Sequence, residues 1–187
     1  MSKPPFSAPV VETVRLRLRR QRLEDFPDIL AMWRSPQVAR YVSGEPQTEE
    51  TIWTKFLRKI GHWRLLGFGY WVVEDKASGC FLGEAGFGEY KRDLHPSLVG
   101  EPEIGWAFAG SAHGQGYATE AARAALNWAD ENFGQIRLSC MIGVENSPSL
   151  RVATKCGFEE TRRALYHGDE VVILHRDVRR SSISAYE

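Results

Sequence analysis

The stretch "SAHGQGYATEA", residues 111–121, decides the fold. Two glycines, Gly114 and Gly116, flank one glutamine, and the chain then enters alanine-rich sequence that predicts a helix. The stretch follows "EIGWAFAG", residues 103–110, whose short apolar pattern predicts a strand. A glycine within a helix costs about 1 kcal/mol relative to alanine. We therefore infer that side chains at these two positions would obstruct something that the turn has to approach.

A strand that leads through a glycine-rich turn into a helix directs several unpaired backbone N–H groups at one point, together with the positive end of the helix dipole. Gly114 and Gly116 let the backbone approach an anion there, and the small Ala118 and Thr119 keep the first helical turn uncrowded. Each such contact contributes about 0.3–2 kcal/mol, so several amides must act together. The turn predicts a pyrophosphate site.

Other nucleotide and catalytic motifs are missing from the sequence. Residues 114–119 read G-x-G-x-x-T, and no Asp or Glu ends a strand about 20 residues later, which disfavours a nicotinamide dinucleotide. The sequence has no G-K-[ST], G-x-S-x-G or H-E-x-x-H, and its five histidines are scattered. We expect neither a P-loop nor a serine hydrolase, and no metal.

The length and composition indicate one domain without a strong electrostatic field around it. The chain has 187 residues, with 24 Lys and Arg against 24 Asp and Glu, so we expect no nucleic-acid partner. The start "MSKPPFSAPV" is not typical of a signal peptide, and no apolar run approaches the ~18 residues of a membrane span. We expect a cytoplasmic protein with no membrane contact. Cys80, Cys140 and Cys156 lie in apolar stretches and are interpreted as reduced core residues.

The pattern along the chain predicts strand, two helices, three strands, helix, strand, helix, two strands. This order indicates an α/β (α+β) fold with a single mixed sheet of about seven strands and helices on both faces. We expect one domain over residues 11–178, with disordered tails at 1–10 and 179–187. The alternation in "TVRLRLRR", residues 13–20, makes Arg15, Arg17 and Arg19 a solvated strand face.

Two further features concern the N-terminal half. A helix starting near Thr48 should carry an apolar stripe, for which core packing is favoured over a partner surface: Ile52, Trp53, Phe56, Leu57, Ile60 and Trp63. The segment "RSPQVARYVSGEP", residues 34–46, is expected to be a loop, and residues 91–102 another.

The motifs resemble the GNAT acetyltransferases. In that family the phosphate loop follows [QR]-x-x-G-x-[GA] after a strand, and the matching span here is 113–118, with His113 in place of Gln or Arg. The words "EIGWAF", "GYATEA" and "NSPSLRVATKCGF" look closest to the branch that acetylates ribosomal-protein N-termini, the Rim type. In that branch an Asn-x-x-Ser precedes a helix ending in Gly-Phe, and Asn146 and Ser149 match it.

The resemblance implies a GNAT-like, centrally splayed sheet and acetyl-CoA as cosubstrate, with its pyrophosphate on the turn amides. The pantetheine arm needs backbone partners, which strands 103–109 and 136–144 can offer if they splay apart. Asn146 can bond a CoA amide or hydroxyl, or simply start a turn. The residues expected to bind the cosubstrate are Phe108 through its backbone, His113, Gly114, Gln115, Gly116, Tyr117, Ala118, Thr119, Asn146 and Ser149.

Acetyl transfer to an amine needs a neutral amine, a polarised thioester carbonyl and a proton for the leaving thiolate. Glu103, a carboxylate in an apolar strand, is the first choice of base, with Glu84 in reserve. Glu103 also has a second interpretation, as a strand residue that pairs with an arginine. Many GNATs place a tyrosine acid where this chain has Ala153, which favours Ser149 or a water as the acid. Ser149 is equally interpreted as a capping residue.

The acceptor is expected to be an amine, either a protein N-terminus or a small molecule. Loop 34–46, with Tyr41, and the last hairpin should wall its site, and the lack of an acidic cluster there disfavours a polyamine. We expect a monomer or a homodimer. Two alternatives stay open: a CoA-binding regulatory or degenerate domain without turnover, and an unrelated module that binds a phosphate ligand.

Overall fold

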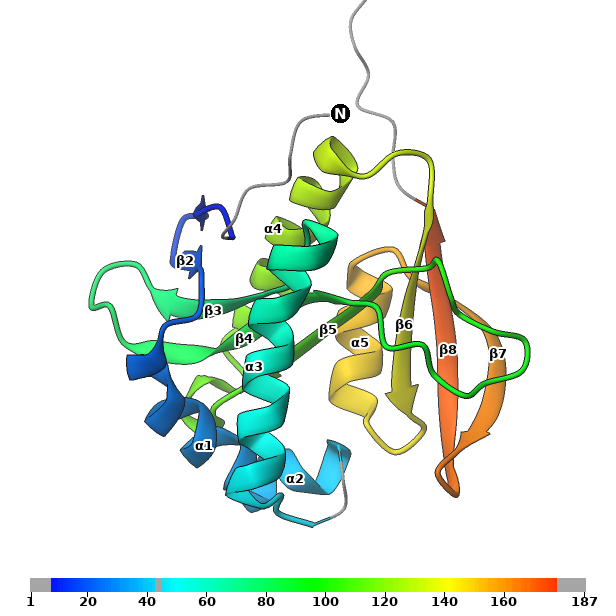
Figure 1. Ribbon diagram of the computed structural model, residues 1–187, viewed down its shortest axis with the longest axis horizontal. Helices are drawn as coiled ribbons and strands as arrows, with labels where there is room; N and C mark the ends of the chain where they lie inside the picture. Colours follow the sequence, from blue (N-terminus) through cyan, green and yellow to red (C-terminus); the bar gives the residue numbers. More distant parts are fainter. Residues whose placement is uncertain (1–7, 43–44, 178–187) are drawn as a thin grey trace, which may run out of the picture.

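The computed structural model describes residues 8–42 and 45–177. Within these residues one sheet of eight strands has the order β1-β2-β3-β4-β5-β6-β8-β7 (Figure 1). Its strands are β1 (Val11–Glu12), β2 (Leu16–Arg19), β3 (Tyr70–Asp75), β4 (Phe81–Gly88), β5 (Glu103–Phe108), β6 (Arg137–Gly143), β7 (Glu159–Tyr166) and β8 (Asp169–Asp177). The helices are α1 (Phe26–Arg34), α2 (Pro36–Val42), α3 (Glu49–Leu66), α4 (Tyr117–Asn132) and α5 (Ser147–Lys155), with 3-10 turns η1 (Leu23–Asp25) and η2 (Gly110–Ala112).

The predicted mixed sheet with helices on both faces is confirmed, with one strand more than the expected seven. The additional strand, β1, has two residues and pairs antiparallel with β2. Part of the expected N-terminal tail packs against the domain beside β1. Ala8 is buried, and the Pro9 carbonyl accepts a hydrogen bond from Trp71 Nε1 at 2.8 Å. Residues 1–7 and 179–187 of the expected tails lie outside the described residues.

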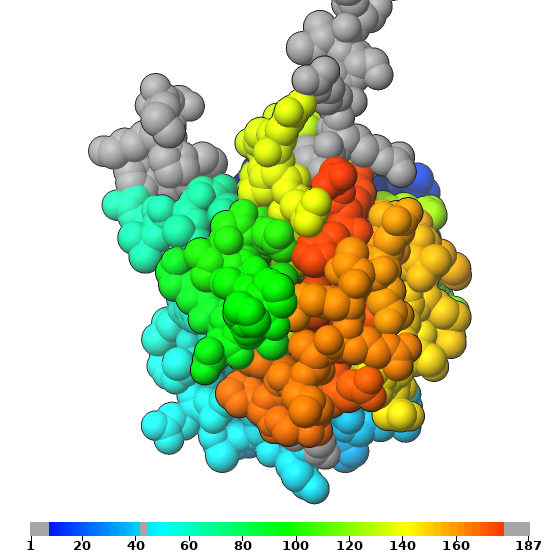
Figure 2. Space-filling view, turned by 90° about the vertical axis from the view of Figure 1, so that its right-hand side faces the viewer, coloured from blue at the N-terminus to red at the C-terminus, as the bar shows by residue number. Residues whose placement is uncertain are grey.

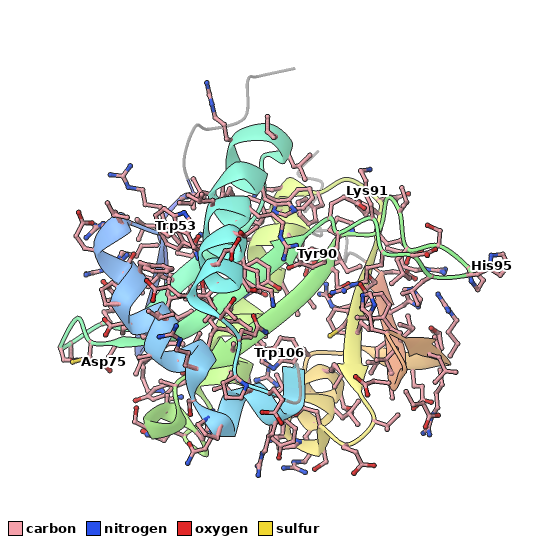
Figure 3. The ribbon with its side chains drawn as sticks, turned by 60° about the horizontal axis from the view of Figure 1, so that its bottom comes forward. Trp53, Asp75, Tyr90, Lys91, His95 and Trp106 are labelled. Atoms are coloured by element: carbon pink, nitrogen blue, oxygen red, sulfur yellow. The ribbon has the colours of Figure 1, made fainter. Side chains whose placement is uncertain are left out.

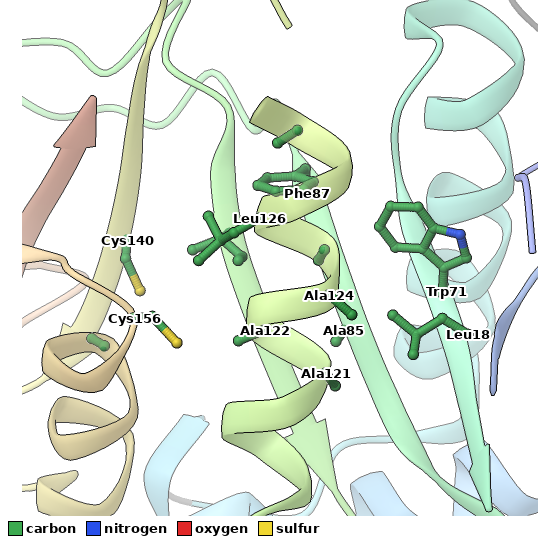
Figure 4. Packing of buried hydrophobic residues seen from close by; sticks show 14 of the residues in the cluster. Leu18, Trp71, Ala85, Phe87, Ala121, Ala122, Ala124, Leu126, Cys140 and Cys156 are labelled. Carbon is green, nitrogen blue, oxygen red and sulfur yellow. The ribbon is translucent and has the colours of Figure 1, made fainter. Parts of the chain in front are cut away.

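Helices α1 and α3 cover one face of the sheet, and α4 covers the other (Figure 1). Strand β3 shows how the sequence divides the two cores. Val72 packs with the α1–α3 face, whereas Trp71 and Val73 pack toward α4, as the alternation of a strand requires. Figure 4 shows alanines of α4 packed over this surface, among them Ala121 and Ala124. Their small side chains let the helix lie close to the aromatic rings of the sheet.

The region expected to be the loop 34–46 contains α2, which corrects the prediction. Pro36 starts the helix, where its missing N–H costs nothing. Val38 and Ala39 are buried, and Val38 packs with Met32 of α1 and Ala107 of β5. Burial against other elements therefore stabilises this helix of only seven residues, which the local sequence pattern does not predict.

Helix α3 begins as predicted, with Thr48 as its N-cap accepting a hydrogen bond from Thr51 N. Its apolar stripe divides, which corrects the assignment of the whole stripe to the core. Ile52, Phe56 and Trp63 are buried, but Trp53, Leu57 and Ile60 are 37%, 49% and 40% exposed. The stripe is wider than the strip that α1 and the sheet can cover. Among the described residues, no helix has the length and apolar character needed to cross a bilayer.

Two other sequence-based expectations are wrong in part. Cys80 is exposed, because it lies in the turn between β3 and β4, whereas Cys140 and Cys156 are buried as expected. Arg19 is not on a solvated face: its side chain is 11% exposed and bonds the carboxylates of Asp25 and Glu74 at 2.7 and 2.6 Å. A buried arginine is stable only with such partners.

Candidate functional site

Strands β5 and β6 separate almost as soon as they meet. They are parallel and pair only at Glu103 and Ser139, whereas all six residues of β5 pair with β4. Figure 1 shows the two strands diverging from that point. Ala109 donates its N–H to Leu82 of β4, so the alternation of an antiparallel strand turns the backbone groups of Trp106 and Phe108 toward the opening. The splay that a pantetheine arm would need is present.

The glycine turn closes the end of β5. Gly114 and Gly116 have φ angles of 75° and 80°, and Gly116 is the N-cap of α4 without a side-chain cap. A Cβ would find open space at Gly114 and only Arg15 Nη2, at 3.6 Å, near Gly116. Left-handed backbone is therefore what requires glycine here. The first bond of the helix runs from Glu120 N to Gly116 O, so the N–H groups of residues 117–119 precede any intrahelical acceptor.

Arg15 braces this turn, a role that the sequence did not predict. Its Nη1 donates to Gln115 O at 3.0 Å, and its guanidinium carbon lies 4.4 Å from the ring centre of Tyr117. Its Nε and Nη2 reach Glu120 Oε2 at 2.8 and 2.6 Å. Burial raises the pKa of Glu120, but hydrogen bonds from Thr13 and Arg15 outweigh it and lower that pKa. Arg15 and Glu120 are 105 residues apart, so no local pattern could have paired them.

His113 bonds the strand that precedes it. Its Nε2 lies 2.9 Å from Phe108 O, so the ring occupies one of the two polar groups of the Phe108 backbone, which is predicted to bind the cosubstrate. The Phe108 side chain is buried in the core. Gln115 Nε2 donates to Ser111 O at 2.8 Å, which holds that side chain within the turn. Because His113 occupies the Phe108 carbonyl, the backbone N–H is the group of Phe108 that can meet a ligand in the opening.

Asn146 and Ser149 lie at the mouth of the opening, where β6 leads into α5. Asn146 is the N-cap of α5, and its Oδ1 accepts from Ser149 N at 3.2 Å. That capping bond uses the oxygen of Asn146 and leaves its NH₂ group as the donor that could meet a ligand. Ala153, which stands where many GNATs have a tyrosine acid, is fully buried. It therefore supplies neither an acid nor a side chain at the surface.

Glu103 forms an ion pair at the point where the splay begins. Arg92 reaches both of its oxygens, Nε to Oε2 at 2.6 Å and Nη2 to Oε1 at 2.7 Å. Burial lowers the pKa of Arg92, but its hydrogen bonds and the charge of Glu103 outweigh burial, and the net shift is upward. Tyr90 lies beside the pair, with its ring centre 4.7 Å from the Arg92 guanidinium carbon. Burial, followed by the charge of Glu103, raises the pKa of Tyr90 to about 12.

The reserve base, Glu84, lies on β4 and is fully buried. Its Oε2 accepts from Lys59 Nζ at 2.5 Å and from Trp33 Nε1 at 2.9 Å, and Oε1 accepts from Gln21 Nε2. These three donors surround the carboxylate. The arrangement is that of a structural ion pair between β4 and α3, rather than of a base open to a substrate.

Helix α3, the loop 89–102 and the β7–β8 hairpin lie around the Arg92–Glu103 ion pair. Figure 2 shows the loop lying against β7, where Arg162 Nη2 donates to Pro96 O at 2.5 Å. Arg92 thereby reaches the end of β7, 5.0 Å from the Tyr166 ring centre. The sequence predicted that residues 34–46 and the last hairpin line an acceptor site, which stays a prediction, and it did not single out the loop 89–102 for that role. Tyr41 lies on α2, where the Arg40 guanidinium stacks on its ring at 4.3 Å.

A surface groove with a volume of about 1100 Å³ lies elsewhere, between the 9–15 segment and α4. It touches the glycine turn only at Gly116 and Thr119. The splay is defined by strand pairing rather than by this groove. Within residues 8–42 and 45–177, no cluster of three or more His, Cys, Asp or Glu side chains is arranged to hold a metal ion.

The chain is similar to known acetyltransferases over most of its length. Residues 15–159 match a family model described as "Acetyltransferase (GNAT) domain". The uncharacterized protein YkkB of Bacillus subtilis is 33% identical over 156 residues, which cover 80% of this chain and 85% of YkkB.

Solved structures agree with this match. A putative GNAT-family acetyltransferase from Bordetella pertussis superposes with a TM-score of 0.80 at 31% identity, covering 90% of this chain and 99% of that one. RimL, a ribosomal alpha-N-protein acetyltransferase solved in complex with coenzyme A, has a TM-score of 0.73 at 15% identity, covering 91% and 98% of the two chains. At that identity the likeness to RimL concerns the fold.

Proposed function

The chain belongs to the GNAT acetyltransferase family, and on this basis we propose that it transfers the acetyl group of acetyl-CoA to a primary amine by direct attack. The observation that carries the proposal is the juxtaposition of the open amide turn at the start of α4 with the splay between β5 and β6. A turn of unpaired N–H groups binds a pyrophosphate, and a splayed strand edge binds an amide-rich arm.

The residues of the turn fit acetyl-CoA. The amides of Gly116, Tyr117, Ala118 and Thr119 would hold the pyrophosphate, and Arg15 would add a positive charge beside it. The Asn146 NH₂ group would meet the pantetheine or ribose side. The N–H of Phe108 would polarise the thioester carbonyl.

The transfer balances without a covalent enzyme intermediate. The neutral amine nitrogen bonds to the thioester carbon, and the carbon–sulfur bond breaks. Glu103, directly or through a water, takes the proton of the acceptor's ammonium and so leaves the amine neutral before the attack. The proton that the nitrogen loses after the attack passes to solvent. The hydroxyl of Ser149, or a water beside it, protonates the thiolate. Arg92 holds Glu103 in place and competes with the amine for its oxygens.

Free-thiol release from acetyl-CoA, followed against a panel of peptides and small amines, tests the proposal. We expect amine-dependent thiol release and a product that is heavier by one acetyl group. Tight binding of acetyl-CoA with no turnover across the panel would instead favour the degenerate, CoA-binding alternative. If ATP or NAD bound as tightly as acetyl-CoA, the turn would not select coenzyme A, and acetyl-CoA as the cosubstrate would be rejected.

A further inference from the structure

Cationic side chains gather on the acceptor side of Glu103. Three of them share one face of α3, and the fourth comes from the loop after β4: Lys55, Arg58, Lys59 and Arg92. Two aromatic rings hold them together. The guanidinium carbons of Arg58 and Arg92 lie 4.9 and 4.7 Å from the ring centre of Tyr90, and the Nζ atoms of Lys55 and Lys59 lie 5.6 and 5.2 Å from that of Trp33. Figure 3 shows Tyr90 between α3 and this loop.

The carboxylates nearby match only half of this charge. Glu84 pairs with Lys59 and Glu103 with Arg92. In the part of the chain that the structure describes, no carboxylate lies within 4.0 Å of the charged nitrogens of Lys55 or Arg58. Lys55 Nζ donates instead to the neutral Gln47 Oε1 at 2.7 Å. Two positive charges therefore remain unbalanced.

The other titratable groups that face the cluster do not supply the missing charge. Tyr70, Tyr90 and Tyr166 are phenols, and burial raises the pKa of the first two. The His62 ring nitrogens meet the backbone of residues 58 and 89. The Glu89 carboxylate accepts a hydrogen bond from Gly100 N and so faces the loop.

The arrangement disfavours the charged form of Lys55. Burial, followed by the charges of Arg58, Lys59 and Arg92, lowers the pKa of Lys55 to about 8. Like charges held together without a counter-ion destabilise a protein unless something that binds there compensates them. The cluster adjoins Glu103, which lies at the start of the splay between β5 and β6.

We propose that the amine acceptor carries a carboxylate, which Lys55 and Arg58 bind while its amine points toward the splay. This inference rests on the proposed acetyltransferase function. The same cations disfavour a charged ammonium beside them and so help to present the amine in its neutral, nucleophilic form. A polyamine would meet repulsion at this surface.

Matched pairs of acceptors test the inference: α-amino acids and dipeptides against their own amides, with spermidine as a polycationic probe. Rates are compared per concentration of neutral amine, because amidation also lowers the pKa of the amine. We expect kcat/KM for the acid to exceed that for its amide by about 10- to 100-fold, the usual worth of a hydrogen bond to a charged group. Spermidine should be the poorest acceptor.

Variants locate the effect. Lys55→Met should bring the acid-to-amide ratio toward one, and Lys55→Arg should restore it. Lys76→Met makes the same charge change at an exposed side chain in the turn after β3. Figure 3 shows its neighbour Asp75 at the left edge of the molecule, away from Tyr90. Lys76→Met should leave the ratio unchanged. Melting curves confirm that each variant is folded.

The outcomes separate this inference from the proposed function. Acetyl transfer with equal rates for acids and amides, or with spermidine preferred, would overturn the carboxylate site and keep the acetyltransferase. If none of these amines were turned over, calorimetry with N-acetylated acids and their amides, in the presence of CoA, would still decide. Absence of a preference for the acid in that titration rejects the carboxylate site.

Discussion

Arg92 holds both carboxylate oxygens of Glu103, at 2.6 and 2.7 Å, at the one position where β5 pairs with β6. The sequence left two interpretations of Glu103 open, a base and a strand residue paired with an arginine, and the second is what the geometry displays. The two roles are compatible, because each oxygen keeps a second lone pair. The two roles make different predictions. In a variant that already lacks Arg92, the loss of Glu103 lowers the rate only if Glu103 is the base.

Replacing Glu103 with glutamine should lower kcat by about 10² to 10⁴, the usual worth of a positioned general base, with little change in acetyl-CoA affinity. Raising the pH should partly rescue the variant, because more of the amine is then already neutral. Steady-state rates against pH, divided by the folded fraction, measure both effects.

The double variant Arg92→Met, Glu103→Gln distinguishes the two roles. If Glu103 serves only to balance Arg92, removing both charges should return the rate close to that of Arg92→Met alone. If Glu103 is the base, the double variant should stay as slow as Glu103→Gln. A Glu103→Gln rate equal to wild type at every pH would move the role to a water.

Gly116→Glu should abolish acetyl-CoA binding, because it introduces a negative side chain at the amide turn and a Cβ at a φ of 80°. Gly134→Glu makes the same change at the other end of α4, where a Cβ would meet nothing within 4 Å, and should bind normally. In wild type, a hundredfold excess of acetyl-CoA over its Kd should stabilise the fold by about 2.7 kcal/mol. Calorimetry that finds equal affinity in the two glutamate variants would exclude the turn as the pyrophosphate site.

Arg15→Ala should weaken acetyl-CoA binding by about tenfold, since it removes a charged donor to Gln115 O and the partner of Glu120. Arg17→Ala is the matched control, because Arg17 lies two residues along and pairs with Glu12 and Glu74 instead. The measurement is Kd by calorimetry at two salt concentrations. A loss of affinity of the same size in both variants would mean that general charge, not the brace, is responsible.

Lys59→Met should destabilise the fold by about 3–5 kcal/mol, because it leaves Glu84 fully buried without its cation. Adding Glu84→Gln should recover much of this loss, since a neutral amide oxygen can still accept from Trp33. Urea unfolding of the single and double variants gives both values. A single-variant loss below about 1 kcal/mol would show that water reaches Glu84.

The parts of the fold that were predictable are those with a local cause. The glycine turn predicted the start of α4, and Thr48 predicted the start of α3, because caps and turn residues act over a few positions. Helix α2 was missed, since its stability comes from burial against Met32 and Ala107, which are distant in sequence or on another element. Propensity carries no record of such packing.

The candidate site likewise has a part that local sequence predicts and a part that depends on distant partners. Its turn follows from spacing within eleven residues, but Arg15, Arg92 and Lys59 owe their roles to partners on other elements. Lys59 looks like an ordinary polar position of an amphipathic helix until β4 places Glu84 opposite it. Charge alone gave no signal, because the whole chain is balanced and the cationic cluster exists only once α3 meets the loop after β4.

Lys55 should make stability rise with pH above about 8. Its pKa in the folded state is lowered to about 8 from the ordinary lysine value of 10.5, chiefly by burial and then by the charge of Arg58. Between these values the unfolded chain binds more protons at Lys55 than the folded chain does, so the free energy of unfolding gains with increasing pH. Below pH 8 both states are protonated, and the full penalty for burying the charge remains. Lys55→Met removes the penalty at every pH.

The measurement is the difference in unfolding free energy between wild type and Lys55→Met from pH 7 to 10. Near pH 7 wild type should have the lower free energy of unfolding, and its difference from Lys55→Met should shrink as the pH rises. Taking the difference cancels the opposite trend from Cys140, whose pKa burial raises in the folded state. Lys76→Met, in which an exposed lysine is lost, should run parallel to wild type throughout. A gap that stays constant from pH 7 to 10 would mean that Lys55 keeps its ordinary pKa and that the cationic cluster is open to solvent.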